Sequence, residues 1–224
     1  YNNLPDIVNE YMNKIWYRNT TWNEEIENSF FKKLGRVKDK SMRAQYLKLQ
    51  AGSLAYTKTP ALMDVAEKLL NKQLTEYSDV VLFVSSAYGL LGDIQGFKGI
   101  YNQAIDLYKK AIDFEATYPN YISPSFMDYA ELAIKTKRTD LYDDVEKIFS
   151  EKRYDSASSF PFALYKKYSI LSIISKYKKD MEKAKYYADL AEENAQKQET
   201  GLNNHQTLGL VTKRDEILDE MVRK

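Results

Sequence analysis

The stretch YNQAIDLYKKAIDF, residues 101–114, shows most clearly how this chain folds. Two small residues, Ala104 and Ala111, flank the aromatic residue Tyr108 at helical spacing. Side chains three, four or seven positions apart share one face of an α-helix. A helix in a self-contained core would favour leucine at the small positions, whereas alanine lets a neighbouring backbone come close. The pattern therefore predicts a helix that a second helix covers at short distance.

The composition favours helices along the whole chain. Its 224 residues include only eight glycines and five prolines, while 44% of the residues are hydrophobic and 29% are charged. Lysine, glutamate, alanine and leucine are frequent, and runs of β-branched residues are almost lacking. Such proportions are typical of a globular protein rather than a disordered one. We therefore predict an all-α fold with a sizeable core.

Residues that correspond to Ala104 recur at intervals of about 40 residues, each after another amphipathic segment. They are Ala66, Ala104, Val145 and Ala184. A unit of two helices cannot bury its apolar face alone, so we expect such units to stack. The predicted helix pairs, in a single domain spanning 1–224, are 5–37, 41–76, 79–118, 124–153 and 161–200. A last helix, 210–223, is predicted to cap the stack with Ile217, Leu218 and Met221 facing inward.

Local signals mark several helix ends. Thr21-Trp22-Asn23-Glu24 has the pattern of a capping box with Thr21 as the cap residue. Thr59-Pro60 and Ser123-Pro124 each place a cap residue before a proline at the first helical position. Gly201 follows a long charged segment and is predicted to end its helix.

The segment around Ala104 resembles a tetratricopeptide repeat. The matching residues are Tyr88, Leu91, Gly92, Ala104, Tyr108 and Ala111, with Pro119 closing the unit. Gln95 stands where the family has a tyrosine. A weaker copy contains Tyr168, Leu171, Ser172 and Ala184. The resemblance implies a right-handed α-solenoid of about five helix pairs with a C-terminal capping helix, and a protein- or peptide-binding scaffold as its usual role.

Residue patterns typical of enzymes and metal sites are lacking. The chain has no cysteine and one histidine, His205, in a segment, 201–210, predicted to dock Leu208 and Leu210 onto the last repeat. Adjacent acids such as Asp143-Asp144 point about 100° apart on a helix, so they do not converge as an acid and a base would. The glycines between 92 and 99 lack the Lys-Ser/Thr ending of a phosphate loop. We predict no catalysis, no metal and no cofactor.

The charge balance argues against nucleic acid as a partner. The 33 basic and 32 acidic residues give a net charge of +1, whereas nucleic-acid-binding domains are strongly basic. No apolar run approaches the roughly 20 residues that span a bilayer. The lack of cysteine suits a reducing compartment, so we predict a cytoplasmic location. Because the first residue is tyrosine, we expect a trimmed or processed chain.

The first helix of each predicted pair should line the concave side of the stack. Side chains projected inward there predict a groove with an apolar floor and a basic rim, which suits an acidic peptide. The predicted groove residues are Lys48, Lys58, Asp93, Phe97, Met127, Ile134, Lys137, Arg138, Lys166, Lys176 and Tyr177. A second explanation stays open, because cations are favoured near helix C-termini anyway. The residues predicted to lie there are Lys58, Lys137, Arg138 and Lys176. Ala51 and Gly89 occupy positions where members of the family that bind chaperone tails need clamp residues, so we do not expect that ligand.

Together these features predict a scaffold that binds a protein or peptide partner. One alternative is a regulatory module of a larger protein, in which a bound peptide changes the curvature of the solenoid. Another alternative is a helical-repeat RNA-binding protein, suggested by tyrosines beside lysines in Tyr165-Lys166-Lys167-Tyr168. The even charge balance makes RNA the weaker of the two.

Overall fold

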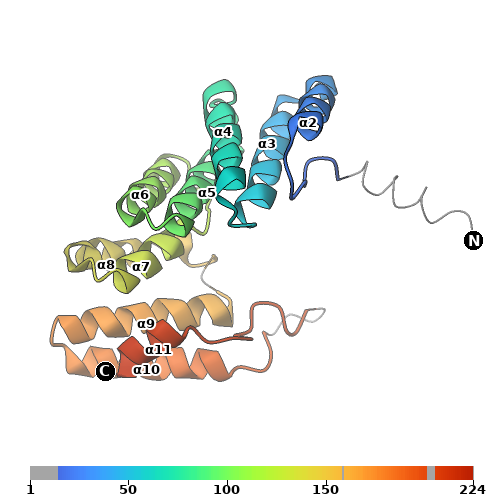
Figure 1. The fold of residues 1–224 in the computed structure, drawn as a ribbon. Helices are drawn as coiled ribbons and strands as arrows, with labels where there is room; N and C mark the ends of the chain where they lie inside the picture. Colours follow the sequence, from blue (N-terminus) through green and yellow to red (C-terminus); the bar gives the residue numbers. More distant parts are fainter. Residues whose placement is uncertain (1–14, 158, 201–204, 224) are drawn as a thin grey trace, which may run out of the picture. The chain divides into compact units, whose positions relative to one another are not determined.

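The computed structural model describes residues 15–157, 159–200 and 205–223 (Figure 1). Helices are the only regular secondary structure in these residues, which confirms the predicted all-α class. The chain divides into two compact units, Tyr1–Tyr121 and Ile122–Lys224, and each unit is described by itself. A continuous right-handed solenoid through the whole chain stays a prediction.

In the first unit, long helices pack in consecutive pairs. Its elements are α2 (Glu24–Arg36), α3 (Lys40–Ala55), α4 (Pro60–Glu76), the 3-10 helix η1 (Val81–Phe83), α5 (Val84–Phe97) and α6 (Tyr101–Thr117). Helix α3 packs along α4 and α5 along α6, while α3 and α4 both contact α5. Their shared core includes the fully buried residues Leu47, Leu54, Leu70 and Ile94. The helices cover 40–76 and 81–117, where the sequence predicts pairs at 41–76 and 79–118.

The second unit contains two further pairs and a terminal helix. Its elements are α7 (Ser125–Lys135), η2 (Thr139–Leu141), α8 (Tyr142–Ser150), η3 (Lys152–Tyr154), α9 (Pro161–Tyr177), α10 (Met181–Gln196) and α11 (Glu216–Arg223). Helix α9 is central, because it packs along α10 and also contacts α7, α8 and α11. Figure 1 shows α11 lying beside α9.

The predicted start and inner face of the terminal helix need correction. Helix α11 begins at Glu216 rather than near residue 210. The reason is Asp215, whose carboxylate accepts the backbone N–H groups of Ile217 and Leu218, each at 3.1 Å, and so caps the helix. Leu218 is fully buried as predicted, but Ile217 is 52% exposed and does not face inward.

The close helix approach predicted around residue 104 is present between α5 and α6. Ala104 and Ala111 are fully buried. A Cβ atom built on Gly92 would lie 2.5 Å from Cε1 of Tyr108, far inside van der Waals contact. The Tyr108 hydroxyl donates a hydrogen bond of 2.8 Å to Asp93 on the facing helix. Gly92 and Tyr108 together therefore set the distance between these two helices.

The turn between the two helices of a pair repeats in both units. One residue with positive φ follows the first helix each time. These residues are Lys58, Gly99, Lys137 and Lys179, with φ of 56°, 76°, 55° and 63°. In three of these turns the next residue donates its N–H to the carbonyl five positions back, as Ile100 does to Gln95 at 2.8 Å. This hydrogen-bond pattern is the Schellman motif that ends helices. The described structure thus repeats at the same interval of about 40 residues as the sequence.

Two helix starts differ from the sequence prediction by one or two residues. Asn23, not Thr21, is the cap residue of α2, because its side chain accepts the N–H of Ile26 at 2.9 Å. Helix α7 begins at Ser125 with Pro124 in the cap position, one residue later than predicted. Several neighbouring residues are able to cap the unpaired backbone N–H groups at a helix start, and the sequence pattern alone does not identify the one that does so.

The start of α4 is as predicted, with Thr59 at the cap and Pro60 as the first helical residue. Thr59 makes no side-chain hydrogen bond to the helix, so the fixed φ of the proline is the stronger local determinant there. Gly201 and residues 5–14 of the predicted pair 5–37 lie outside the described residues.

Candidate functional site

Three of the predicted groove residues of the first unit gather where α3 and α5 end. The Lys58 ammonium lies 4.7 Å from the ring centre of Phe97, and that ring meets Tyr56 edge-on at 5.9 Å between ring centres. Asp93 accepts hydrogen bonds from the hydroxyls of Tyr56, at 3.0 Å, and Tyr108, at 2.8 Å. Burial raises the pKa of Asp93 by more than these two hydrogen bonds lower it. The carboxyl is therefore held inside the fold, and Tyr56 joins a cluster in which the sequence did not include it.

Lys48, the fourth predicted residue of the first unit, is also held by its neighbours. Its ammonium donates a hydrogen bond of 3.2 Å to the Ser86 hydroxyl and lies 4.9 Å from the ring centre of Phe83. Burial lowers the pKa of Lys48. This lysine thus joins α3 to the start of α5, and its charge is only partly available to a partner.

In the second unit, several predicted groove residues have structural roles. Ile134 is fully buried, so it belongs to the core and cannot line an open groove. Arg138 forms two hydrogen bonds with Asp140, of 2.9 and 2.7 Å. Lys137 is the positive-φ residue of the turn after α7. The sequence could not separate these residues from groove residues, because a core position and an inner-face position have the same helical spacing.

The last predicted residues on α9 contact other helices of the same unit. Lys176 donates a hydrogen bond of 2.7 Å to the carbonyl of Val222 on α11. Tyr177 is 58% exposed, and one side of its ring packs edge-on against Tyr142, with ring centres 5.2 Å apart.

Alternating charges connect α7, α9 and the start of α11. Glu131 accepts hydrogen bonds from Lys166 at 2.5 Å and from Lys135 at 2.6 Å, and Lys135 also contacts Asp215 at 2.6 Å. Burial alone would lower the pKa of Lys135, but its bonds to Asp215 and Glu131 outweigh burial and raise it. Because two predicted basic-rim residues, Lys166 and Arg138, each face an acid, the positive potential offered to an acidic peptide is reduced.

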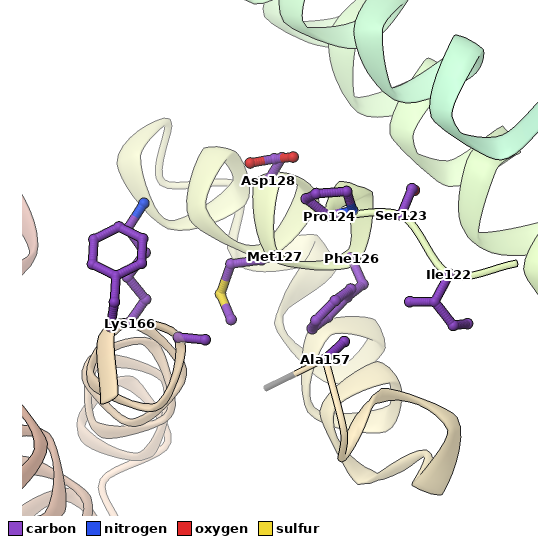
Figure 2. Close-up of a pocket in the computed structure, with 10 residues that line it drawn as sticks. Ile122, Ser123, Pro124, Phe126, Met127, Asp128, Ala157 and Lys166 are labelled. Atoms are coloured by element: carbon purple, nitrogen blue, oxygen red, sulfur yellow. The ribbon is translucent and has the colours of Figure 1, made fainter. Parts of the chain in front are cut away.

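An apolar pocket of about 340 Å³ lies between α7 and the start of α9, and we call it the α7–α9 pocket (Figure 2). Its lining residues are Ile122, Ser123, Pro124, Phe126, Met127, Asp128, Ala157, Phe162, Ala163 and Lys166. Figure 2 shows Phe126 and Met127 pointing from α7 into this space and Lys166 standing on the helix opposite. Two predicted groove residues, Met127 and Lys166, therefore meet at one site.

Phe162 forms the exposed rim of the α7–α9 pocket and was not predicted from the sequence. It is 41% exposed, and the Lys166 ammonium lies 4.8 Å from its ring centre. Its position follows from Pro161, which begins α9 and places Phe162 in the first turn. In the sequence, the one signal for this site was an aromatic residue directly after a proline. The opposite wall of the pocket depends on the path of residues 122–127, which the sequence pattern does not indicate.

A second cavity, of about 430 Å³, lies next to the first and shares Phe162 and Lys166 with it. Its other lining residues are Lys135 and residues 213–217. The segment that leads into α11 therefore forms one wall of this second cavity.

The segment that contains His205 is held differently from the prediction. Leu208 is 54% exposed, so it does not dock onto the last repeat. Gly209 makes the close contact instead. It has φ of 77°, its carbonyl accepts the N–H of Phe162 at 2.8 Å, and an added Cβ would lie 2.5 Å from the ring of Phe160. A glycine is needed at this position for both its conformation and its space.

The chemistry of the α7–α9 pocket suits binding. Apolar side chains make up most of its wall, with the Lys166–Glu131 ion pair at one edge. Across the described residues, no group of three or more His, Cys, Asp or Glu side chains could hold a metal ion. No helix in the described part of the chain is long and apolar enough to cross a membrane.

Comparison with known proteins gives no family to which the chain can be assigned. No protein-family model, no curated protein and no solved structure matches it.

Proposed function

We propose that the chain is a non-catalytic peptide-binding protein and that the α7–α9 pocket receives a large apolar side chain of its partner. The observation that carries this proposal is the pocket itself, which opens beside an exposed aromatic residue, Phe162. Ligand pockets of roughly 300–1,000 Å³ with mostly apolar walls are typical binding sites. At about 340 Å³, this pocket suits one anchoring side chain rather than a large cofactor.

We further propose that the helix pairs stack as a tetratricopeptide-like solenoid. The recurring left-handed turns after α3, α5, α7 and α9 and the tight contact of Gly92 with Tyr108 support this proposal. Proteins built in this way commonly use the first helices of their pairs to bind peptides. The α7–α9 pocket lies between two such first helices.

The ion pairs beside the pocket favour an apolar anchor over a strongly acidic partner. Lys166 already neutralises Glu131, and its ammonium lies over the ring of Phe162, so its charge adds little to the capture of an acid. We expect most of the binding free energy to come from the anchoring side chain, as at the hot spots of other protein interfaces.

A selection from phage-displayed random peptides on the immobilised chain tests this function. The recovered peptides are then measured by isothermal titration calorimetry against the wild type and against Ala163→Trp, which fills the pocket from α9. We expect peptides that share a large apolar residue, and a loss of affinity of about tenfold or more in the variant.

Ala61→Trp is the matched control, because Ala61 also lies in the first turn of a helix that begins with proline, Pro60 of α4. This variant should bind the selected peptides as the wild type does. Thermal unfolding of both variants checks that they are folded. Failure to enrich peptides with a shared apolar residue, or equal affinities in the Ala163→Trp and Ala61→Trp chains, would refute the proposal.

A further inference from the structure

Helix α11 packs against α9, with Leu218 as its one buried residue and with several polar contacts. Leu218 is fully buried, whereas the next residue towards the N-terminus, Ile217, is mostly exposed. Helix α11 is only eight residues long, and residues 197–215 join it to α10. Isolated helices shorter than about 12–15 residues are marginal in water, so α11 depends on this contact for its order.

The polar contacts run along the whole length of α11. At its start, Asp215 contacts Lys135 at 2.6 Å, and its N–H donates to the Tyr165 hydroxyl at 3.0 Å. In the middle, that hydroxyl donates to Asp219 at 2.7 Å. At its end, the carbonyl of Val222 accepts the Lys176 ammonium. We call the residues that receive α11, namely Lys135, Tyr165 and Lys176, the α11 docking surface.

The docking surface recognises a simple arrangement of side chains. Asp215, Leu218 and Asp219 lie three and four positions apart and so share one face of a helix. The Asp215 carboxylate contacts the Lys135 ammonium and the Asp219 carboxylate accepts from the Tyr165 hydroxyl. Leu218 is the apolar residue between the two acids. Three of the groove residues that the sequence predicts as partner-binding lie on this same helix α9, namely Lys166, Lys176 and Tyr177.

The contact also leaves space that α11 does not fill. The second cavity, of about 430 Å³, lies between the start of α9 and residues 213–217. A partner helix that continues further towards its own N-terminus would extend into this space, which Phe162 and Lys166 line. The surface beneath α11 thus has the chemistry to take a longer helix in its place.

We propose that α11 is an internal ligand of the α11 docking surface on α9 and the end of α7, and that an amphipathic partner helix with the spacing Asp-x-x-Leu-Asp binds there by displacing α11. None of the three residues of the α11 docking surface lines the α7–α9 pocket, although the adjoining second cavity shares Phe162 and Lys166 with that pocket. Tethering makes α11 a strong competitor, since a segment on a short linker acts at an effective concentration in the millimolar range. Partner binding therefore requires a helix that gains more contacts than α11 has.

The chain's own terminal sequence provides the probe. A fluorescein-labelled peptide of residues 212–224 is titrated with the full-length wild type and with full-length Leu218→Asp, and its anisotropy is measured. In the variant, α11 carries a charge where Leu218 is buried, so it leaves the surface and the added peptide takes its place. We expect the Leu218→Asp chain to bind the peptide at least about tenfold more tightly than the wild type.

Two further reagents separate specific docking from adhesion. A peptide that itself carries Leu218→Asp should not bind either chain. Tyr165→Phe, introduced into the Leu218→Asp chain, should weaken peptide binding severalfold, because it removes the bonds to Asp215 and Asp219. If the Leu218→Asp chain does not fold, the double variant Asp215→Ala/Asp219→Ala releases α11 through its polar contacts and should show the same gain.

Three results would overturn the proposal. One is equal peptide affinity for the wild type and a folded chain with α11 released, and another is equal binding of the two peptides. The third is a concentration-dependent dimer of the wild type that Leu218→Asp abolishes, because a second copy would then be the occupant. None of these measurements changes a residue that lines the α7–α9 pocket. Their results are therefore independent of the outcome of the peptide selection.

Discussion

At the residue scale, the spacing of α5 and α6 depends on the absence of a side chain at Gly92. We expect Gly92→Ala to lower the free energy of unfolding by about 1–3 kcal/mol, the usual cost of overpacking a core. The new methyl group would lie 2.5 Å from the ring of Tyr108, which is hydrogen-bonded to Asp93 and cannot shift freely. Urea denaturation followed by circular dichroism measures the change.

Gly35→Ala is the control for this substitution. Gly35 also lies in a helix, α2, but an added Cβ would meet nothing within 4 Å. Alanine is a better helix former than glycine, so this variant should gain roughly 0.5–1 kcal/mol. A similar loss in both variants would show that contact with Tyr108 does not explain the effect at Gly92.

Asp93 should make the stability of the chain depend on pH. Its pKa is raised in the folded state, mainly by burial, against the hydrogen bonds from Tyr108 and Tyr56. The folded state therefore holds this proton more tightly than the unfolded state, so the stability contribution is full below the unfolded-state pKa. It is lost as the pH rises from the ordinary value of 3.8 through the raised pKa.

Asp93→Asn removes this titration and should flatten the pH profile of stability in that window. The free energy of unfolding of both chains is measured at closely spaced pH values from about 3.5 upward. The two curves should converge at the acidic end and separate as the pH rises, with the wild type falling more steeply. Curves that run parallel across the window would mean that Asp93 does not cause the dependence.

At the scale of single elements, the turns after α7 and α9 each hold a lysine in the left-handed region. Lys137 and Lys179 have φ of 55° and 63°, where the equivalent turn after α5 has Gly99. An L-residue costs roughly 1–2 kcal/mol in this conformation and glycine does not. We therefore expect Lys137→Gly and Lys179→Gly each to raise the free energy of unfolding, by about 0.5–1 kcal/mol.

Lys68→Gly, at an exposed position inside α4, is the comparison and should destabilise the chain by about 1 kcal/mol. If backbone conformation decides the outcome, chemical denaturation should show a higher free energy of unfolding for Lys137→Gly and Lys179→Gly and a lower one for Lys68→Gly. If Lys137→Gly destabilises the chain as Lys68→Gly does, the lysine side chain contributes contacts that outweigh the strain of its backbone.

The helices were easier to predict than the contacts between them. Spacing of three and four residues determines which segments are helical, and the covered face of residues 101–114 followed from Ala104 and Ala111. The ion pairs between helices could not be predicted from this spacing, because Glu131 meets Lys166 only after α7 and α9 have packed. The α7–α9 pocket as a whole was also missed, since its walls combine the start of α9 with the start of α7 and with residues 122–124, which precede α7 and have no helical spacing.

At the scale of the whole molecule, the repeat explains how the chain builds its cores. The helices α3, α5, α7 and α9 each end in a turn with a positive-φ residue. Helix α3 packs mainly on α4, α5 on α6 and α9 on α10, whereas α7 contacts α9 more than it contacts α8. Stability in such arrays is approximately a sum of unit and neighbour contributions. The division into Tyr1–Tyr121 and Ile122–Lys224 adds a boundary, because the contacts that define each unit are made within it.

This organisation predicts that a core defect acts mainly within its own unit. Leu54→Ala in α3 and Ile170→Ala in α9 each remove a fully buried side chain and should cost about 2–5 kcal/mol. Hydrogen exchange followed by mass spectrometry should then show faster exchange in α3 to α6 for Leu54→Ala, and in α7 to α10 for Ile170→Ala. If either substitution speeds exchange equally throughout the described helices, the chain opens as one cooperative structure.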